Sequence, residues 1–224
     1  MKVCQLRIAV LCVLLGLVGC FDIDQTLVVG IDKNTEFNVV FSIDSALVEL
    51  GDSADVDLKK TCNTKDVFEE GALPGELERV NNIRVVNSTL LCEYTITGPL
   101  SGFEQLSSDV SDELGNVRLL SLDRLDDSRA RIVAVYDFSG DAADEMSNGT
   151  SIEQSVRRMI ASNFEGHAIR WSVKAPTILE SNGEIAADGR SVTWELPLQE
   201  AIASAGRFRF EAVIDVKQYR PRFF

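Results

Sequence analysis

The chain has 224 residues, a formal net charge of −13 and 45% hydrophobic residues, which is enough apolar material for one well-packed domain. The acidic balance excludes nucleic acid as the natural partner, because phosphate binding gains its affinity from basic side chains. The single histidine, His167, argues against histidine-based catalysis and against a multi-histidine metal site.

The N-terminus has the three parts of an export signal. Lys2 and Arg7 precede an apolar run over residues 8–18, and Gly19 and Cys20 follow it. The run is shorter than the roughly 20 residues that a membrane-spanning helix needs. A cysteine directly after Gly19 resembles the lipobox of bacterial lipoproteins. In those proteins the cysteine thiol receives a diacylglycerol and the peptide before it is removed.

The lipobox resemblance implies a signal peptide over residues 1–19 and a single extracytoplasmic domain over residues 20–224, anchored to the cell membrane by acyl chains on Cys20. Each buried methylene contributes about 0.8 kcal/mol, so two or three chains make the anchor effectively permanent. Loss of Lys2 and Arg7 lowers the net charge from −13 to −15. Because anionic bilayers repel such a surface, we expect the domain to face away from the membrane.

Two cysteines, Cys62 and Cys92, remain once the signal peptide is removed and Cys20 is acylated. An even pair in an exported domain indicates a disulfide. A bridge over this separation would restrict the unfolded chain by roughly 3 to 4 kcal/mol. The alternatives are a zinc pair, which requires further ligands, and two buried thiols, which require a reducing compartment.

The rest of the chain predicts hairpins and a few helices. Alternating and β-branched segments predict three hairpins, formed by residues 24–29 with 36–43, 83–87 with 90–97, and 117–122 with 130–138 across an aspartate-rich turn. Helical patterns cover residues 44–51, 103–110 and 150–163, with an acidic helix-and-loop segment over 52–75. Further strands are predicted over residues 168–173, 191–196 and 208–216. About nine strands in hairpins against two or three helices predict an α+β fold with an antiparallel sheet.

In the second half of the chain, a predicted strand ending near Pro176 leads through Ser181-Asn182-Gly183 to a strand that contains Val192-Thr193-Trp194. This pattern resembles the end of the LppM-like family of bacterial lipoproteins. Residues 45–51 resemble the helix after the family's first strand pair, and residues 98–103 resemble its link from a central strand into a helix.

The family resemblance implies a curved antiparallel β-sheet packed against two or three helices, helix-grip-like, with affinity for envelope glycolipids and no catalytic residues. The family's mycobacterial type member carries a C-terminal membrane segment. The present sequence, which runs to Phe224, shows none, so we expect lipidation to be its only anchor.

Trp171 and Trp194 are the candidate ligand-binding residues. They lie on two strands that flank the Ser181-Asn182-Gly183 loop, and facing positions on a hairpin would bring the two rings together. The rings either line a pocket for an acyl chain or a sugar, or pack in the core. His167 has no nucleophile motif beside it, which is typical of a surface or capping histidine. Four acidic residues could hold calcium or form a solvated loop: Asp137, Asp141, Asp144 and Glu145.

The sequence favours a non-enzymatic lipoprotein without cofactor or metal, which binds an envelope lipid, a glycolipid or another amphiphile between the sheet and the helix over residues 150–163. Nucleotide-binding, zinc-protease and nucleophile-elbow motifs are absent from the sequence. The alternative is a structural or assembly lipoprotein that binds another envelope protein. The first hypothesis predicts an apolar cavity of about 300 Å³ or more. The second predicts a filled core and an exposed apolar patch.

Overall fold

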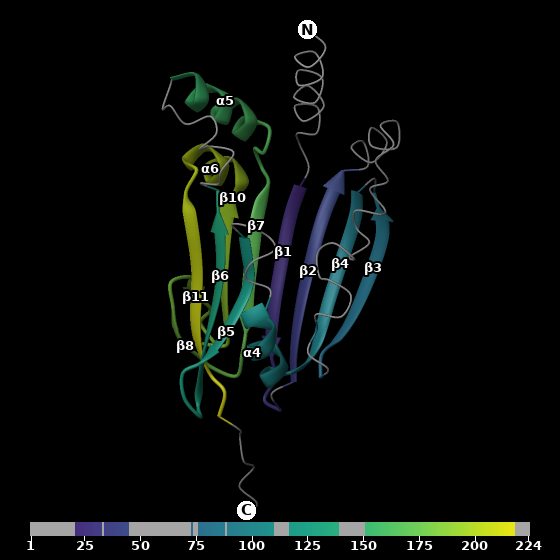
Figure 1. The fold of residues 1–224 in the computed structure, drawn as a ribbon, viewed down its shortest axis with the longest axis vertical. Helices are drawn as coiled ribbons and strands as arrows, with labels where there is room; N and C mark the ends of the chain where they lie inside the picture. Colours follow the sequence, from purple (N-terminus) through teal and green to yellow (C-terminus); the bar gives the residue numbers. More distant parts are fainter. Residues whose placement is uncertain are drawn as a thin grey trace, which may run out of the picture.

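The computed structural model describes residues 21–32, 34–44, 73, 76–87, 89–109, 117–138 and 151–217. Within these ranges the chain forms eleven strands in two sheets, together with three short helices (Figure 1). The large sheet has the order β3-β4-β2-β1-β7-β10-β9, and the small sheet has the order β5-β6-β11-β8. The predicted α+β class with mostly antiparallel strands is confirmed.

Two predicted hairpins build half of the large sheet. β1 (Phe21–Val29) pairs with β2 (Asn34–Asp44), and β3 (Glu78–Val86) pairs with β4 (Thr89–Pro99). β4 then pairs with β2, so the two hairpins lie side by side. Side chains alternate between the two faces of these strands, because the period of a strand is two residues. On β4 every second residue, from Leu90 to Ile96, is buried on the inner face.

The other half of the large sheet contains the one parallel pair among the described strands. β7 (Ala168–Lys174) runs parallel to β1, with Trp171 opposite Gln25. β10 (Ser191–Pro197) pairs antiparallel with β7, and the short β9 (Glu184–Ile185) forms the edge. Nothing in the local pattern of residues 24–29 or 168–173 indicates that these segments pair.

The small sheet begins with the third predicted hairpin, β5 (Val117–Arg124) and β6 (Arg129–Asp137). In its turn the Asp126 carboxylate accepts hydrogen bonds from the backbone N–H groups of Ser128 and Arg129. The Ser128 backbone N–H, the Arg129 guanidinium and the Ser128 hydroxyl all donate to this carboxylate and hold the pKa of Asp126 far below its usual value. β11 (Arg207–Asp215) and β8 (Ile178–Ser181) complete this sheet.

The two sheets face one another, which corrects the expectation of one sheet covered by helices. Phe210 of the small sheet contacts Trp171 and Trp194 of the large sheet, with ring centroids 6.3 Å and 5.7 Å away. The three helices are α4 (Leu100–Asp109), α5 (Ser151–Ser162) and α6 (Leu198–Ser204). α5 packs mainly on α6, which contacts β7 and β10. The helix over residues 150–163 therefore exists as predicted, but it does not supply the main cover of the sheet.

Short elements account for most of what the sequence pattern missed. β8, β9 and α6 have between two and seven residues, too few to show a periodic pattern. The predicted helix over residues 44–51 lies outside the described residues apart from Asp44, which ends β2. The segment over residues 52–75 lies outside them except for Leu73.

Asn182 joins the two sheets at the edge where the chain passes from β8 to β9. Its Oδ1 atom accepts hydrogen bonds from Trp194 Nε1 and from the backbone N–H of Glu211, each at 2.9 Å. Its Nδ2 group donates to the carbonyl oxygen of Arg209 at 2.8 Å. A side chain at Gly183 would collide with the indole of Trp194, so glycine is required there. The Ser-Asn-Gly turn is thus a staple between β10 and β11.

Replacing Asn182 with alanine should lower the free energy of unfolding by about 1 to 2 kcal/mol, since the partly buried indole N–H of Trp194 and an exposed backbone N–H both lose their acceptor. Urea denaturation of the full chain measures this change. Asn82→Ala is the matched control, because Asn82 is exposed like Asn182 but makes only a 3.4 Å contact with Glu93 on the neighbouring strand. Equal losses in the two variants would contradict the assignment of Asn182 as a staple.

Candidate functional site

The interior between the sheets is closed at one end by α4. Leu100 and Phe103 of this helix are 1% and 0% exposed and belong to the hydrophobic core. α4 contacts β5 of the small sheet and β2 and β4 of the large sheet, so it bridges the two layers. The inward-facing side chains at this end of the strands, such as Leu27 and Phe37, are almost fully buried.

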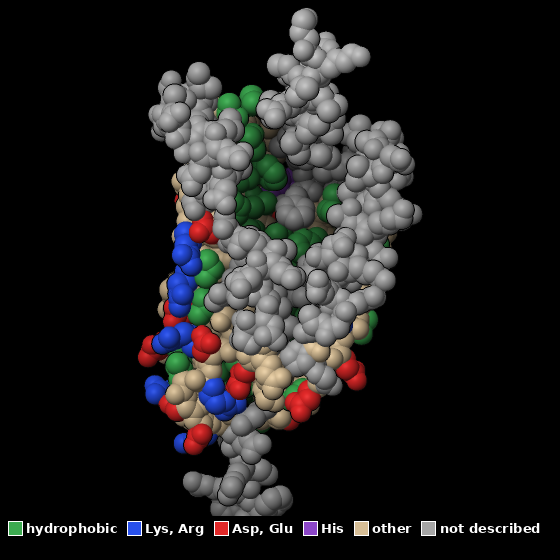
Figure 2. All heavy atoms as spheres, in the orientation of Figure 1, with side chains coloured by type: hydrophobic (Ala, Val, Ile, Leu, Met, Phe, Trp, Pro, Cys, Tyr) green, Lys and Arg blue, Asp and Glu red, His purple; other side chains and the backbone are tan. Residues whose placement is uncertain are grey.

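At the opposite end the interior is covered less completely. Six hydrophobic side chains there pack against the core but stay partly exposed: Ile23, Phe41, Ile43, Phe138, Phe164 and Phe208. They lie where β1 begins, where β2 and β6 end, where β11 begins, and just after α5. Figure 2 shows a hollow lined by hydrophobic side chains in the same half of the molecule. We call this recess the hollow.

Aromatic contacts give the open end its shape. In the small sheet, one edge-to-face contact joins Phe138, directly after β6, to Phe208 of β11. Their ring centroids are 6.1 Å apart. On the large sheet Phe41 meets Tyr94 edge to face at 5.7 Å. These pairs hold the side chains in fixed orientations, so the apolar surface at this end is pre-formed.

Three buried polar groups lie one step deeper in the interior, on strands of both sheets. Gln25, Tyr136 and Trp171 are each 1% exposed. The Trp171 indole N–H has no hydrogen-bond partner among the described residues, and the Gln25 amide and the Tyr136 hydroxyl lie near one another without a hydrogen bond of regular geometry. Burial raises the pKa of Tyr136 well above its usual value, and the neighbouring Gln25 amide lowers it by less. The sequence reasoning missed this group, although Gln25 is the single polar residue among the inward positions 23, 25, 27 and 29 of β1.

Trp171 and Trp194 occupy facing positions on β7 and β10, as the hairpin pattern predicts, with ring centroids 4.7 Å apart. They are 1% and 8% exposed and contact Phe210. The two rings thus form part of the core at the closed edge of the sandwich. Trp171 is cross-strand neighbour to Gln25, and its indole N–H is one of the three buried polar groups.

His167 holds the start of β1 to β7. Its Nδ1 atom lies 3.1 Å from the Asp22 carboxylate, which also accepts a hydrogen bond of 2.9 Å from the backbone N–H of Ala168. Arg170 lies 3.4 Å from the same carboxylate. His167 therefore has a structural contact at the end of the sheet, close to the capping role expected from the sequence.

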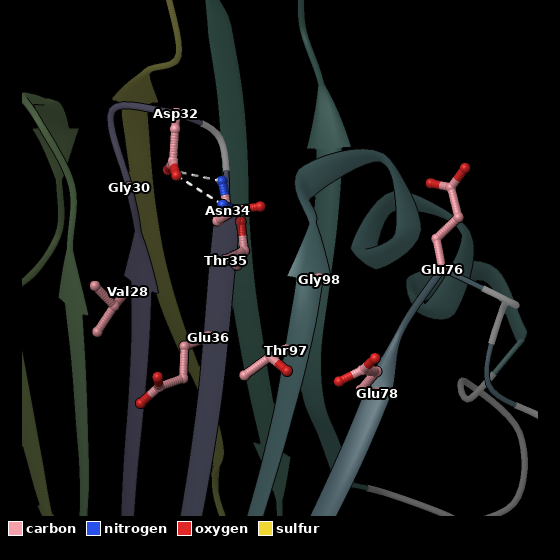
Figure 3. A pocket seen from close by; sticks show the side chains of 10 residues that line it. All are labelled: Val28, Gly30, Asp32, Asn34, Thr35, Glu36, Glu76, Glu78, Thr97 and Gly98. Carbon is pink, nitrogen blue, oxygen red and sulfur yellow. Dashed lines mark hydrogen bonds between the residues drawn. The ribbon is translucent and has the colours of Figure 1, made fainter.

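Two cavities with volumes of about 590 Å³ and 400 Å³ lie away from the hollow. The larger one lies beside the β1–β2 turn, where Figure 3 shows Asp32, Glu36, Glu76 and Glu78 spread around an open depression. The smaller one is a groove around Arg170 on β1, β7 and β10, and Trp171 and Trp194 are among the residues that line it. It is thus bordered by two of the three segments that the sequence hypothesis names, 168–173 and 191–196, but no residue of 152–160 lines either cavity.

The described residues contain no cluster of three or more metal-ligating side chains. Of the acidic residues considered for calcium, Asp137 ends β6, and Asp141, Asp144 and Glu145 lie outside the described part. In the described ranges no helix combines the length and the apolar character needed to cross a bilayer. Cys20 and Cys62 also lie outside the described residues.

By its fold the protein is an α+β sandwich of two mostly antiparallel sheets, with an apolar hollow at one end. No protein family and no curated protein matches the sequence. Among solved structures, the chain is similar to the NMR structure of the folded domain of LppM from Mycobacterium tuberculosis. The TM-score is 0.51 at 13% sequence identity, over 92% of this chain and 95% of that one. The protein therefore has an LppM-like fold, as the sequence motifs implied.

Cys92 lies on the inner face of β4, is 2% exposed, and is cross-strand neighbour to Phe41 and Ile83. The predicted partner, Cys62, belongs to the segment between β2 and β3.

Titration of the unfolded, unreduced mature protein should find no free thiol, and Cys62→Ser should expose one on Cys92. The same substitution should destabilise the protein by roughly 3 kcal/mol. Two titratable thiols in the wild type would contradict the pairing.

Proposed function

We propose that the protein is a non-enzymatic, extracytoplasmic lipoprotein, anchored through Cys20, that binds an envelope lipid, a glycolipid or another amphiphile in the hollow. The observation that carries this proposal is the unequal closure of the interior. α4 fills one end with Leu100 and Phe103, whereas six hydrophobic side chains at the other end stay partly exposed. Close packing is the rule in protein interiors, so an apolar recess between two layers is typical of a ligand site.

The chemistry of the hollow suits an acyl chain. Its partly exposed side chains are aliphatic and aromatic, and covering each of them removes apolar surface from water at about 25 cal/mol per Å². Phe41, Phe138 and Phe208 approach from both sheets and offer flat apolar faces. An acyl chain laid between the sheets would complete the core at this end.

The buried polar group favours an amphiphile over a plain hydrocarbon. A buried donor or acceptor without a partner costs about 1 to 3 kcal/mol. Gln25, Tyr136 and Trp171 carry no formal charge, and burial keeps the Tyr136 hydroxyl protonated. An ester carbonyl or a sugar hydroxyl would match them, and a small side-chain adjustment would bring such a group within reach.

Three further observations support the location at the envelope. The lipobox-like sequence at Cys20 supplies the attachment, and the chain shares its fold with the folded domain of LppM from Mycobacterium tuberculosis. The mature net charge of −15 leaves the acyl chains as the main source of membrane affinity.

A structural or assembly role remains the second candidate, and β3 is the observation that favours it. This edge strand exposes four apolar side chains, with exposed fractions of 64% for Val80, 40% for Ile83, 62% for Val85 and 44% for Val86. An edge strand with apolar side chains can add a strand from another protein to its sheet.

Cys20→Ser should move the protein from the detergent phase to the aqueous phase of a detergent partition, or leave it unprocessed, because no other thiol at the cleavage site can accept a diacylglycerol. Mass spectrometry of the wild-type N-terminal peptide should find the acyl chains on Cys20. Wild-type protein in the aqueous phase would overturn the lipoprotein assignment.

Ile43→Glu should weaken the binding of an added phospholipid by about tenfold or more, since it puts a charge at the apolar end of the interior. Native mass spectrometry of the full chain in mixed micelles with phosphatidylglycerol measures bound lipid. Ile31→Glu is the matched control, because it makes the same change at a 64% exposed position in the opposite turn. Equal binding by both variants and the wild type, or no lipid on any of them, would contradict the hollow as the site and favour the assembly role.

A further inference from the structure

The start of β1 is both the predicted point of lipid attachment and a border of the open end. β1 begins at Phe21, the residue directly after Cys20. Phe21 is cross-strand neighbour to Ile43, and two residues later Ile23 is neighbour to Phe41 and to Ile169. Ile43, Ile23 and Phe41 belong to the partly exposed set at the hollow.

The first residues of β1 are fixed to the rest of the sheet. The Asp22 carboxylate receives the backbone N–H of Ala168 at 2.9 Å and lies 3.1 Å from His167 Nδ1. Consecutive Cα atoms are about 3.8 Å apart, so the Cα atom of Cys20 lies within roughly 8 Å of the Cα atom of Asp22. The chain thus has no spacer between the acylated residue and the folded sandwich.

This short connection fixes which end of the molecule can meet the membrane. Acyl chains on Cys20 must lie in the bilayer, and the rigid strand that follows holds the same end of the sandwich at the headgroups. Figure 1 places α5 and α6 at this end and the β1–β2 turn at the other. On α5, Met159 is 49% exposed and its neighbour Arg158 is exposed as well, a pairing of apolar and basic side chains that suits an anionic interface.

The charge at the far end agrees with this orientation. The open depression beside the β1–β2 turn carries Asp32, Glu36, Glu76 and Glu78. An anionic leaflet repels such a cluster, and the orientation set by Cys20 keeps it at the greatest distance from the lipid. In this orientation the acidic cluster beside the β1–β2 turn points away from the membrane, while the α5 end rests on it.

We propose that the α5 end of the sandwich docks on the surface of the bilayer that holds the Cys20 acyl chains, so that the hollow takes its ligand directly from that leaflet. The docking rests on the lipid anchor of the proposed function, and the loading step rests on amphiphile binding in the hollow. The partner of this surface is thus a lipid leaflet and not a second protein.

Two tryptophan reporters test the orientation in the full, lipidated protein. Met159→Trp marks the α5 end, and Ile31→Trp, at a similarly exposed position, marks the far turn. Each is reconstituted into phosphatidylglycerol and phosphatidylethanolamine vesicles with or without brominated acyl chains, and the wild type gives the baseline from Trp171 and Trp194. Met159→Trp should lose emission beyond the wild-type loss, and Ile31→Trp should match the wild type. Equal loss by both reporters, or loss by neither, would overturn the docking.

A flexible insertion between Cys20 and Phe21 separates docking from ligand binding. About ten Gly/Ser residues give an r.m.s. reach of roughly 16 to 19 Å, enough to free the domain from the surface. The insertion should reduce quenching of Met159→Trp and slow uptake of pyrene-labelled phosphatidylglycerol from the same vesicles. Binding of that lipid from micelles should stay unchanged, because the hollow is intact. Unchanged vesicle uptake would overturn direct loading, whereas absent micelle binding in every variant would overturn the proposed ligand.

Discussion

The sandwich depends on one set of contacts between its two sheets, made by Trp194, Phe210 and Asn182. The rings of Trp194 and Phe210 stack across the two sheets at an interplanar angle of 17°, and Asn182 links the indole N–H to the backbone of β11. The chain passes from β8 to β9 at this point, so the two layers are joined covalently and by side chains along one edge. Because that edge is fixed, the separation of the layers elsewhere depends on what lies between them.

The material between the layers differs from end to end. α4 follows β4 directly and carries Leu100 and Phe103 into the space between β5 and the β2–β4 pair. α5 and α6 lie at the other end. α5 contacts mainly α6, and the strands that α6 contacts most are β7 and β10. The side chains of β1, β2, β6 and β11 at that end are consequently covered in part. Among the described elements, the placement of the three helices thus leaves this end of the interior less covered than the other.

Hairpins were predictable because both strands and their turn lie in one stretch of sequence. The alternating residues of β1–β2, β3–β4 and β5–β6 predicted their pairing, although β3 begins at Glu78, five residues before the predicted start at residue 83. The parallel pair of β1 with β7 joins residues about 146 positions apart and has no local signal. The second sheet was missed for the same reason, since β8 has four residues and β11 pairs with distant β6. At the site, the sequence indicated Trp171 and Trp194 but not Gln25, whose partners belong to other strands.

The position of the proposed anchor bears on the free energy that an acyl chain needs to move from a leaflet into the hollow. An acyl chain that passes from a leaflet into the hollow leaves one apolar environment for another, so the hydrophobic contribution nearly cancels. The same chain exposed to water on the way would cost about 0.8 kcal/mol per methylene. A short path between leaflet and hollow therefore matters for the rate, and the anchor that we propose next to β1 would provide it. With the apolar contribution balanced, selection among lipids would depend on polar contacts, and we propose that the buried amide, hydroxyl and indole N–H of Gln25, Tyr136 and Trp171 make them.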